Sequence, residues 1–266
     1  MGNSETVLKQ ALELDFVYMD TFTTRIPTAW GYLFCNEGHP AYYTANHAHL
    51  YDAPQDPKAV IEEVLQFYGE RNLVPRFYIY NLEQQTAFLR EVQNYGFRYE
   101  ELVSPVQVWD KQLPVLHGRQ GVVIEQVTEA NFQEALDIEC SIPELGGRAV
   151  REKAFTEEFQ HPCFTHYLLR LDGTACAVAC LFSDGKQGRI ESVATKLEFR
   201  GKGLIGELIR FIQAEAKQKE LENLWIFPIN ERVERVYARY GFQTAGTFRV
   251  GHAFLSGKSI HEINQG

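Results

Sequence analysis

The residues best suited to chemistry lie between positions 189 and 206 and end in the turn R-G-K-G at residues 200–203. Glycine at two of these four positions lets a bulky group approach the main chain closely. Apolar residues recur at helical spacing over residues 204–217, so a helix begins directly after the turn. A helix N-terminus presents unpaired N–H groups and the positive end of the helix dipole. The turn therefore predicts a site for an anion, most naturally a phosphate or pyrophosphate.

Two side chains near this turn could move protons. Glu191 lies in the strand predicted for residues 189–195, and it shares a strand face with Val193 if that strand is regular. It could accept a proton directly or through water, although a solvated or salt-bridged glutamate fits the pattern equally well. Tyr237 lies in a short helix predicted after Asn230, and a phenol with an ordinary pKa near 10 stays protonated at neutral pH. Such a base and acid could together carry out general acid–base catalysis.

The glycine turn resembles the R/Q-x-x-G-x-G/A loop of the GNAT superfamily, the acetyl-CoA-dependent N-acyltransferases. Arg200, Gly203 and Ile205 fall on the three signature positions. Ile205 departs from the family's Gly or Ala, and Gly206 follows one residue late. An ordinary turn between a strand and a helix is the alternative interpretation of this loop alone.

A second segment strengthens the resemblance. Residues 230–242 resemble the family's N-x-x-A-x-x-L-Y-x-x-x-G-F pattern through Asn230, Tyr237, Gly241 and Phe242. The two motifs occur in the family's order, separated by one predicted helix and one predicted strand. Together they identify the chain as resembling a GNAT N-acetyltransferase that transfers an acetyl group from acetyl-CoA to a primary amine.

The resemblance also implies roles for individual residues. Tyr237 would protonate the departing sulfur, and Glu191 is the candidate base. The main chain of residues 193–195 would pair with the pantetheine arm, and the N–H groups of the loop would hold the pyrophosphate. The implied set for the co-substrate is Val193, Thr195, Arg200, Gly201, Lys202, Gly203, Ile205, Gly206 and Asn230, with Lys202 a secondary candidate. Tyr240, by contrast, is expected on the helix surface.

Composition limits the classes of partner. The 266-residue chain is 45% hydrophobic and carries a formal net charge of −9, which indicates a folded protein with an acidic surface. Such a surface repels nucleic acid and anionic membranes and weakly favours a cationic or neutral substrate. No apolar run is long enough to span a bilayer, so a cytoplasmic enzyme is expected. The sequence is compatible with a homodimer. The five cysteines lack C-x-x-C spacing, so no disulfide framework is expected.

A metal site is not expected. His47 and His49 are two residues apart, but no third ligand lies near them in the sequence. We interpret them as polar loop residues that follow a strand at residues 42–45.

The order of predicted elements repeats once along the chain. The order helix, aromatic strand, asparagine, helix, Tyr-Gly-Phe stop and strand occurs over residues 57–109 and again over residues 204–250. The first copy is entered through Pro54-Gln55-Asp56-Pro57, where prolines remove donors and Asp56 places negative charge at the helix start. Val92 stands where the second copy has Tyr237. We therefore predict a degenerate, non-catalytic first copy.

The expected fold class is α/β, of the α+β type with mixed sheets, in two GNAT-like domains that each have a central mixed sheet flanked by helices. The boundaries are residues 1–112 for the degenerate domain and 120–266 for the acetyltransferase domain, joined by a linker at 110–121. Other expected features are a helix at 6–22, a hairpin of strands at 166–171 and 175–182, a polar substrate lid at 140–164 and a polar tail at 256–266.

Two other functions fit the same motifs. Ile205 and the degenerate first copy would suit a CoA-binding or structural module that has lost catalysis. A transferase of the same fold that moves an aminoacyl or longer acyl group is the second alternative. The sequence does not identify the acceptor.

Overall fold

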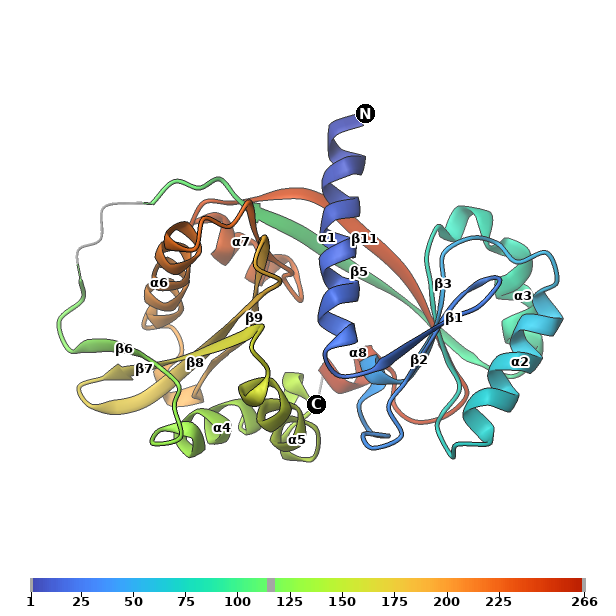
Figure 1. The fold of residues 1–266 in the computed structure, drawn as a ribbon, viewed down its shortest axis with the longest axis horizontal. Coiled ribbons are helices and arrows are strands. Elements are labelled where there is room, and N and C mark those ends of the chain that lie inside the picture. The colour runs from blue at the N-terminus through green and yellow to red at the C-terminus, as the bar shows by residue number, and fades with distance from the viewer. Residues whose placement is uncertain (1, 114–117, 265–266) are drawn as a thin grey trace. The chain divides into compact units, whose positions relative to one another are not determined.

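The computed structural model describes residues 2–113 and 118–264, and these form two compact units (Figure 1). Unit 1 contains the described residues up to Tyr18 and those from Pro105 to Thr247. Unit 2 contains Met19–Ser104 and the described residues from Phe248 onward. The units thus divide the chain differently from the predicted break at residues 112–120. Residues 114–117 of the predicted linker lie outside the described residues.

Unit 1 has a mixed sheet in the order β6-β7-β8-β9-β10-β5. Its elements are α1 (Gly2–Asp20, whose last two residues belong to unit 2), β6 (Val122–Gln126), α4 (Phe132–Cys140), α5 (Arg148–Gln160), β7 (Phe164–Leu171), β8 (Thr174–Ser183), β9 (Gln187–Thr195), α6 (Leu204–Gln218), β10 (Asn223–Ile226) and α7 (Glu231–Ala238). The predicted hairpin is present as β7 and β8, which pair antiparallel. In contrast, β9 and β10 pair parallel.

Helices cover both faces of this sheet (Figure 1). The apolar stripe of α6 places Leu208, Ile209 and Ile212 in one core cluster with residues of β8, β9 and β10. A second cluster lies under α4 and α5 and includes Ile138 and Phe155. Helix α6 therefore buries the face that its 3.6-residue apolar spacing predicts.

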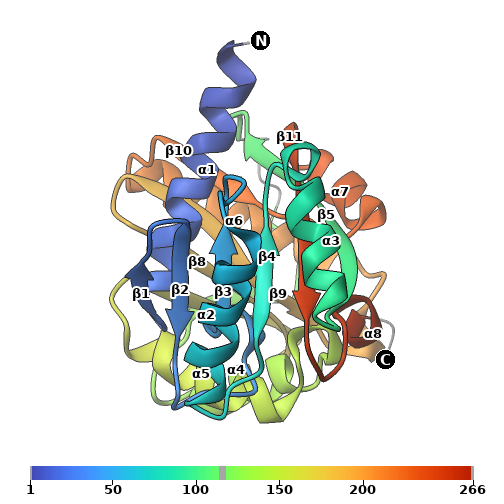
Figure 2. The same cartoon turned by 90° about the vertical axis from the view of Figure 1, so that its right-hand side faces the viewer.

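Unit 2 has a sheet in the order β1-β2-β3-β4-β11. Its elements are β1 (Thr24–Pro27), β2 (Gly31–Cys35), β3 (His47–Leu50), α2 (Pro57–Gly69), β4 (Arg76–Ile79), α3 (Thr86–Asn94) and α8 (Ile260–Asn264). Figure 2 shows α2 and α3 over one face of these strands. The core on that face includes Ile61, Val64, Phe77 and Phe88. No helix of the described residues has both the length and the apolar content that a membrane crossing requires.

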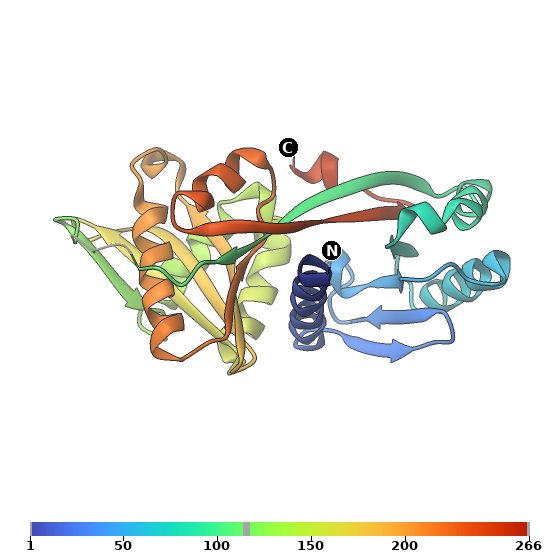
Figure 3. The same cartoon turned by 90° about the horizontal axis from the view of Figure 1, so that it is seen from above.

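The two longest strands, β5 (Arg98–Trp109) and β11 (Phe242–Phe254), each contribute residues to both units (Figure 3). In unit 1, β5 pairs antiparallel with β10 through Val108 and Trp225. In unit 2, β11 pairs antiparallel with β4 through Gly251 and Ile79. Each sheet therefore includes a strand from the other half of the sequence, which is why a single boundary does not separate the units.

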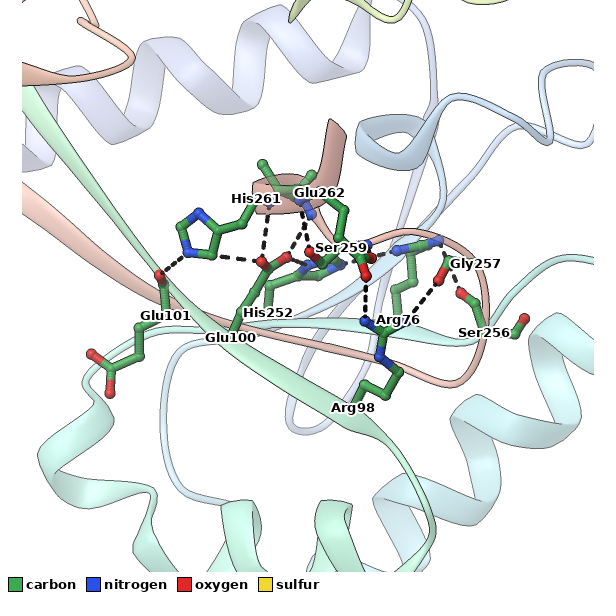
Figure 4. A network of polar contacts seen from close by, with 11 residues as sticks. Arg76, Arg98, Glu100, Glu101, His252, Ser256, Gly257, Ser259, His261 and Glu262 are labelled. Carbon is green, nitrogen blue, oxygen red and sulfur yellow. Dashed lines mark hydrogen bonds and ion pairs between the residues drawn. The ribbon is translucent and has the colours of Figure 1, made fainter. Parts of the chain in front are cut away.

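Residues 256–264 of the predicted polar tail are instead a folded part of unit 2 (Figure 4), and the tail's last two residues lie outside the described residues. Glu100 on β5 accepts hydrogen bonds from the backbone N–H of Ile260, at 2.7 Å, and of His261, at 3.1 Å. Ser259 and Glu262 cap the short helix α8 reciprocally, and Arg98 donates to Glu262 at 3.0 Å. Glu100 and Arg98 lie far from the tail in sequence, so the local composition of the tail did not predict these two partners.

His252 links the same carboxylate to a buried arginine (Figure 4). Its Nδ1 lies 2.7 Å from Glu100 Oε1, and its Nε2 lies 3.1 Å from Arg76 Nη1. Burial lowers the pKa of His252 to about 4, so the ring is neutral and donates through Nδ1 while Nε2 accepts. Both ring nitrogens of His252 are therefore engaged by described residues.

The interpretation of His47 and His49 as loop residues is wrong. Both lie on β3 and are buried, with 0% and 1% of their surface exposed. The predicted strand at residues 42–45 is a 3₁₀ turn. His47 stacks on Phe34 with ring centroids 4.7 Å apart, and His49 stacks on Tyr80 at 4.5 Å. The described residues gather no third ligand around them that could complete a metal site.

Candidate functional site

The start of α6 offers an open row of hydrogen-bond donors. Gly201 and Gly203 have φ values of +78° and +74°, the left-handed region that glycine adopts without strain. A Cβ added at either position would meet nothing within 4 Å, so the space above the turn is free. Within the described chain, the N–H groups from Gly201 to Ile205 have no backbone or side-chain acceptor. Gly203 occupies the N-cap position and supplies no side-chain oxygen. This is the geometry of an anion cradle.

The corresponding helix of unit 2 is already capped. Asp56 Oδ1 accepts from Lys58 N and Ala59 N, both at 3.1 Å, and Pro57 occupies the first turn. The carboxylate therefore occupies the donors that an anion would need. In addition, β3 pairs with β4 along its length through Leu50. These two features agree with the predicted loss of the anion site in the first copy.

Strand β9 loses its pairing with β10 before it reaches the glycine turn. Its parallel pairing with β10 ends at Ile190 opposite Ile226, although β9 continues to Thr195. On the other side, pairing with β8 shifts register after Glu191, and Ser192 has a φ of +50°. A bulge of this kind turns the backbone out of the regular ladder. The main chain after Ile190 thus presents polar groups along an edge that no strand of unit 1 covers.

Side chains at the end of β9 and in the turn complete this edge. Thr195 is buried, and its Oγ1 has no hydrogen-bond partner in the described residues. Arg200 Nε donates to Thr195 O at 3.2 Å, which ties the exposed arginine to the strand end. Lys202 Nζ lies 4.6 Å from the centre of the Phe199 ring. Arg119 Nη1 donates to the carbonyl of Lys202 and brings a further cation to the turn.

Gly206 has a packing role that the motif did not indicate. A Cβ at this position would lie 2.1 Å from the hydroxyl oxygen of Tyr240. The expectation that Tyr240 lies on the helix surface is wrong, because its ring packs against the core beside α6. Gly206 is therefore required by the close approach of this ring. Ile205 also packs against the core through its side chain, so its backbone N–H is the group that faces an anion.

Tyr237 points its ring into unit 1 from α7. The residue is 7% exposed, and its hydroxyl makes no hydrogen bond with any described residue. Burial and the negative charge of Glu191 raise its pKa above the ordinary value, so the phenol is protonated at neutral pH. Asn230 caps α7, since its Oδ1 accepts from Val233 N at 3.0 Å. This bond gives the asparagine of the motif a structural role. Its contact with the co-substrate stays a prediction.

Glu191 is half-buried, and three charged side chains affect the pKa of its carboxyl. Burial raises the pKa of its carboxyl, Arg189 lowers it, and Asp15 and Glu158 raise it again. Arg189 forms an ion pair with Glu191 through Nε and contacts Asp15 Oδ1 at 2.6 Å through Nη1. The salt-bridged glutamate of the alternative interpretation is therefore present. A carboxylate whose pKa is raised is a stronger base than an ordinary glutamate.

A second buried ion-pair cluster lies beneath the bulge. Arg151 of α5 donates to Glu139 at 2.8 Å and forms a bidentate pair with Glu158 at 3.1 and 2.8 Å. Its Nη2 also lies 3.4 Å from Ser192 Oγ. Burial raises the pKa of Glu139 to about 7 and lowers that of His166 to about 4. The polar residues of the predicted lid segment thus lie partly in the core, where they hold the bulge.

Asp15, Arg151 and Glu158 were not singled out from the sequence. Asp15 stands four residues after Ala11, next to Leu14 and Tyr18, which are all buried on α1. A charged residue at the border of an apolar helical stripe is the signal that could have identified it.

Known protein families and solved structures resemble this chain. Residues 132–242 match the model of the acetyltransferase (GNAT) family. Among solved structures, the chain resembles a GCN5-related N-acetyltransferase from Kribbella flavida with a TM-score of 0.65 and 18% identity, covering 97% of each chain. A conserved protein of unknown function from Staphylococcus epidermidis matches with a TM-score of 0.71 and 12% identity, covering 88% of this chain and 95% of that one. Curated protein sequences gave no match.

A tandem GNAT protein from the clavulanic acid biosynthesis pathway is also similar, with a TM-score of 0.53 and 12% identity over 76% of this chain and 70% of that one. The residues that match the GNAT family model, 132–242, lie within unit 1. The predicted fold class, mixed sheets flanked by helices with the GNAT fold, is confirmed.

Proposed function

We propose that the protein is an N-acetyltransferase that transfers an acetyl group from acetyl-CoA to a primary amine by direct attack in a ternary complex. The observation that carries the proposal is the row of unpaired N–H groups from Gly201 to Ile205, next to the open edge of β9. In unit 2, Asp56 takes the donors at the start of the corresponding helix α2 and β3 is paired through Leu50, so we assign the proposed activity to unit 1.

The residues present fit acetyl-CoA. The turn at residues 201–205 would hold the pyrophosphate through backbone donors, and Arg200, Lys202 and Arg119 would add positive charge. The polar main chain of residues 193–195 and the unpartnered Thr195 Oγ1 would meet the amides of the pantetheine arm. When bound, acetyl-CoA supplies a thioester whose acetyl group an amine can accept.

Proton movement is assigned to Glu191 and Tyr237. Glu191 would take the proton of the attacking amine, and Tyr237 would protonate the sulfur that leaves. The two steps support each other, because the charge of Glu191 raises the pKa of Tyr237. Once Glu191 is protonated, that charge is gone and the pKa of the phenol falls. The acid thus becomes stronger at the stage when it must donate.

A thiol-release assay over acceptor amines tests the proposal. The full chain would be incubated with acetyl-CoA and with small amines, peptides and aminoglycosides, and product formation would be verified by mass. We expect at least one amine to be acetylated, with release of one thiol for each amide formed. Thiol release without amide, or no release with any acceptor despite tight CoA binding, would favour the catalytically silent CoA-binding module.

The same assay with longer acyl-CoA donors and aminoacyl donors separates the other alternative. Faster turnover of a longer donor would assign the chain to an aminoacyl or long-acyl transferase of the same fold. A cytoplasmic location and a homodimer stay predictions of the sequence.

A further inference from the structure

The first helix of the chain reaches the proposed base through one arginine. Arg189 is 2% exposed and lies on β9 two residues before Glu191. Its Nη1 contacts Asp15 Oδ1 of α1 at 2.6 Å, while its Nε forms the ion pair with Glu191. One guanidinium therefore holds two carboxylates through different edges.

The arginine itself is clamped between two rings. Its guanidinium carbon lies 4.3 Å from the centre of the Tyr18 ring and 4.8 Å from that of the Phe227 ring. Tyr18 also belongs to α1, one helical turn after Asp15, whereas Phe227 directly follows β10. A planar cation held between two aromatic faces has little freedom to rotate. Asp15, which pairs with Nη1 of this guanidinium, therefore determines that the Nε edge faces Glu191.

We propose that Asp15 is a positioning residue for acyl transfer: it holds Arg189 so that the guanidinium is shared, and the carboxylate of Glu191 keeps the orientation and basicity that a general base needs. This inference rests on the proposed function of Glu191. It assigns α1, which precedes the degenerate unit in sequence, to the catalytic machinery. Without Asp15, Arg189 would pair with Glu191 alone and hold it as an ordinary carboxylate.

The other groups around Glu191 come from three elements. Glu158 of α5 raises its pKa, and Tyr237 of α7 and Cys180 of β8 respond to its charge. Arg151 of α5 is neutralised by Glu139 and Glu158. These groups are unchanged when Asp15 is replaced, so a shift in the behaviour of Glu191 would report on Asp15, both through its charge and through the shared arginine.

The test compares Asp15→Asn, Asp15→Glu and a matched control in the full chain. Asp15→Asn keeps the shape and removes the charge, and Asp15→Glu keeps the charge. Glu13→Gln changes charge by the same amount at an exposed position of the same helix. Each variant would be checked for folding by thermal unfolding and for CoA binding by calorimetry.

We expect Asp15→Asn to move the acid limb of the kcat/KM profile to lower pH by roughly 1 unit and to lower the plateau, with CoA affinity unchanged. Asp15→Glu should restore most of the shift, and Glu13→Gln should leave the profile alone. A ¹³C-detected titration of the Glu191 carboxyl, assigned with Glu191→Gln, should show the same downward shift without any acceptor.

The two readouts separate the inference from the function on which it rests. If no acceptor is turned over by the native chain, the proposed function fails, and the titration still shows whether Asp15 sets the pKa of Glu191. If Asp15→Asn is folded and both the profile and the titration match the native protein, the positioning role is overturned. A lower melting temperature with an unmoved profile would likewise reduce Asp15 to a structural ion pair.

Discussion

Replacing Tyr237 with phenylalanine removes one hydroxyl and keeps the ring that packs in unit 1. Because this hydroxyl makes no hydrogen bond with a described residue, its loss should cost well under the roughly 1 kcal/mol that a protein hydrogen bond contributes. Affinity for CoA should also hold, since the donors for the pyrophosphate lie on the turn at residues 201–205. Turnover should fall by about a hundred- to ten-thousand-fold, or roughly 3 to 5 kcal/mol of barrier, the usual worth of a general acid.

A buried tyrosine of unit 2 provides the control. Tyr68 is 0% exposed, and its hydroxyl donates to the carbonyl of Phe34 at 2.8 Å. Tyr68→Phe should therefore lose about 1 to 2 kcal/mol of stability, which lowers the melting temperature by a few degrees, and should leave turnover per folded molecule unchanged.

Steady-state turnover, calorimetry and thermal unfolding on both variants decide the matter. A large rate loss with unchanged stability in Tyr237→Phe, and the reverse in Tyr68→Phe, is the expected pattern. Native turnover by Tyr237→Phe on a verified acceptor would remove the phenol from the mechanism. A rate loss matched by weaker CoA binding would show instead that the hydroxyl holds the co-substrate.

Three further predictions concern the co-substrate site and the pH dependence of stability. Gly203→Glu should abolish CoA binding by calorimetry, because its carboxylate would occupy the donors as Asp56 does in unit 2; undiminished affinity would place the pyrophosphate elsewhere. Val92→Tyr should create no second site, and native mass spectrometry should find one CoA per chain in the variant and the native protein alike. Burial lowers the pKa of His49 to about 3 and that of His252 to about 4, so the unfolded chain binds more protons and stability falls as pH drops from about 6.5 toward 4. At pH 5 each should cost about 2 kcal/mol relative to pH 7 in urea unfolding, and a free energy of unfolding that does not fall between these pH values would contradict the neutral, buried rings.

Much of the local structure was predictable from the sequence. The glycine turn between strand and helix, the apolar stripe of α6, the hairpin of β7 and β8 and the capped start of α2 all depend on residues within a few positions of one another. Side-chain spacing and turn chemistry determine such features directly. The family resemblance rested on the same short segments, and so did the choice of Tyr237 and Glu191, whose roles remain to be measured.

The contributions of α1, β5 and β11 were decided only by the tertiary structure. The sequence order suggests two consecutive domains, yet α1 packs in unit 1, and each sheet takes a strand from the other half of the chain. Strand pairing between distant segments depends on the edges that remain open after local folding. The residue spacing within a segment does not determine which distant strand edge the segment will pair with.

The same distinction applies to the charged residues. Asp15 and Glu139 are acidic residues of the kind usually found on a protein surface. Their sequence neighbours supply no positive charge within hydrogen-bonding reach. Their partners, Arg189 and Arg151, come from other elements through packing. Local sequence thus determined the turn that can bind an anion, whereas the environment of the proposed base depends on charges that only folding brings together, because electrostatic coupling acts through space rather than along the chain.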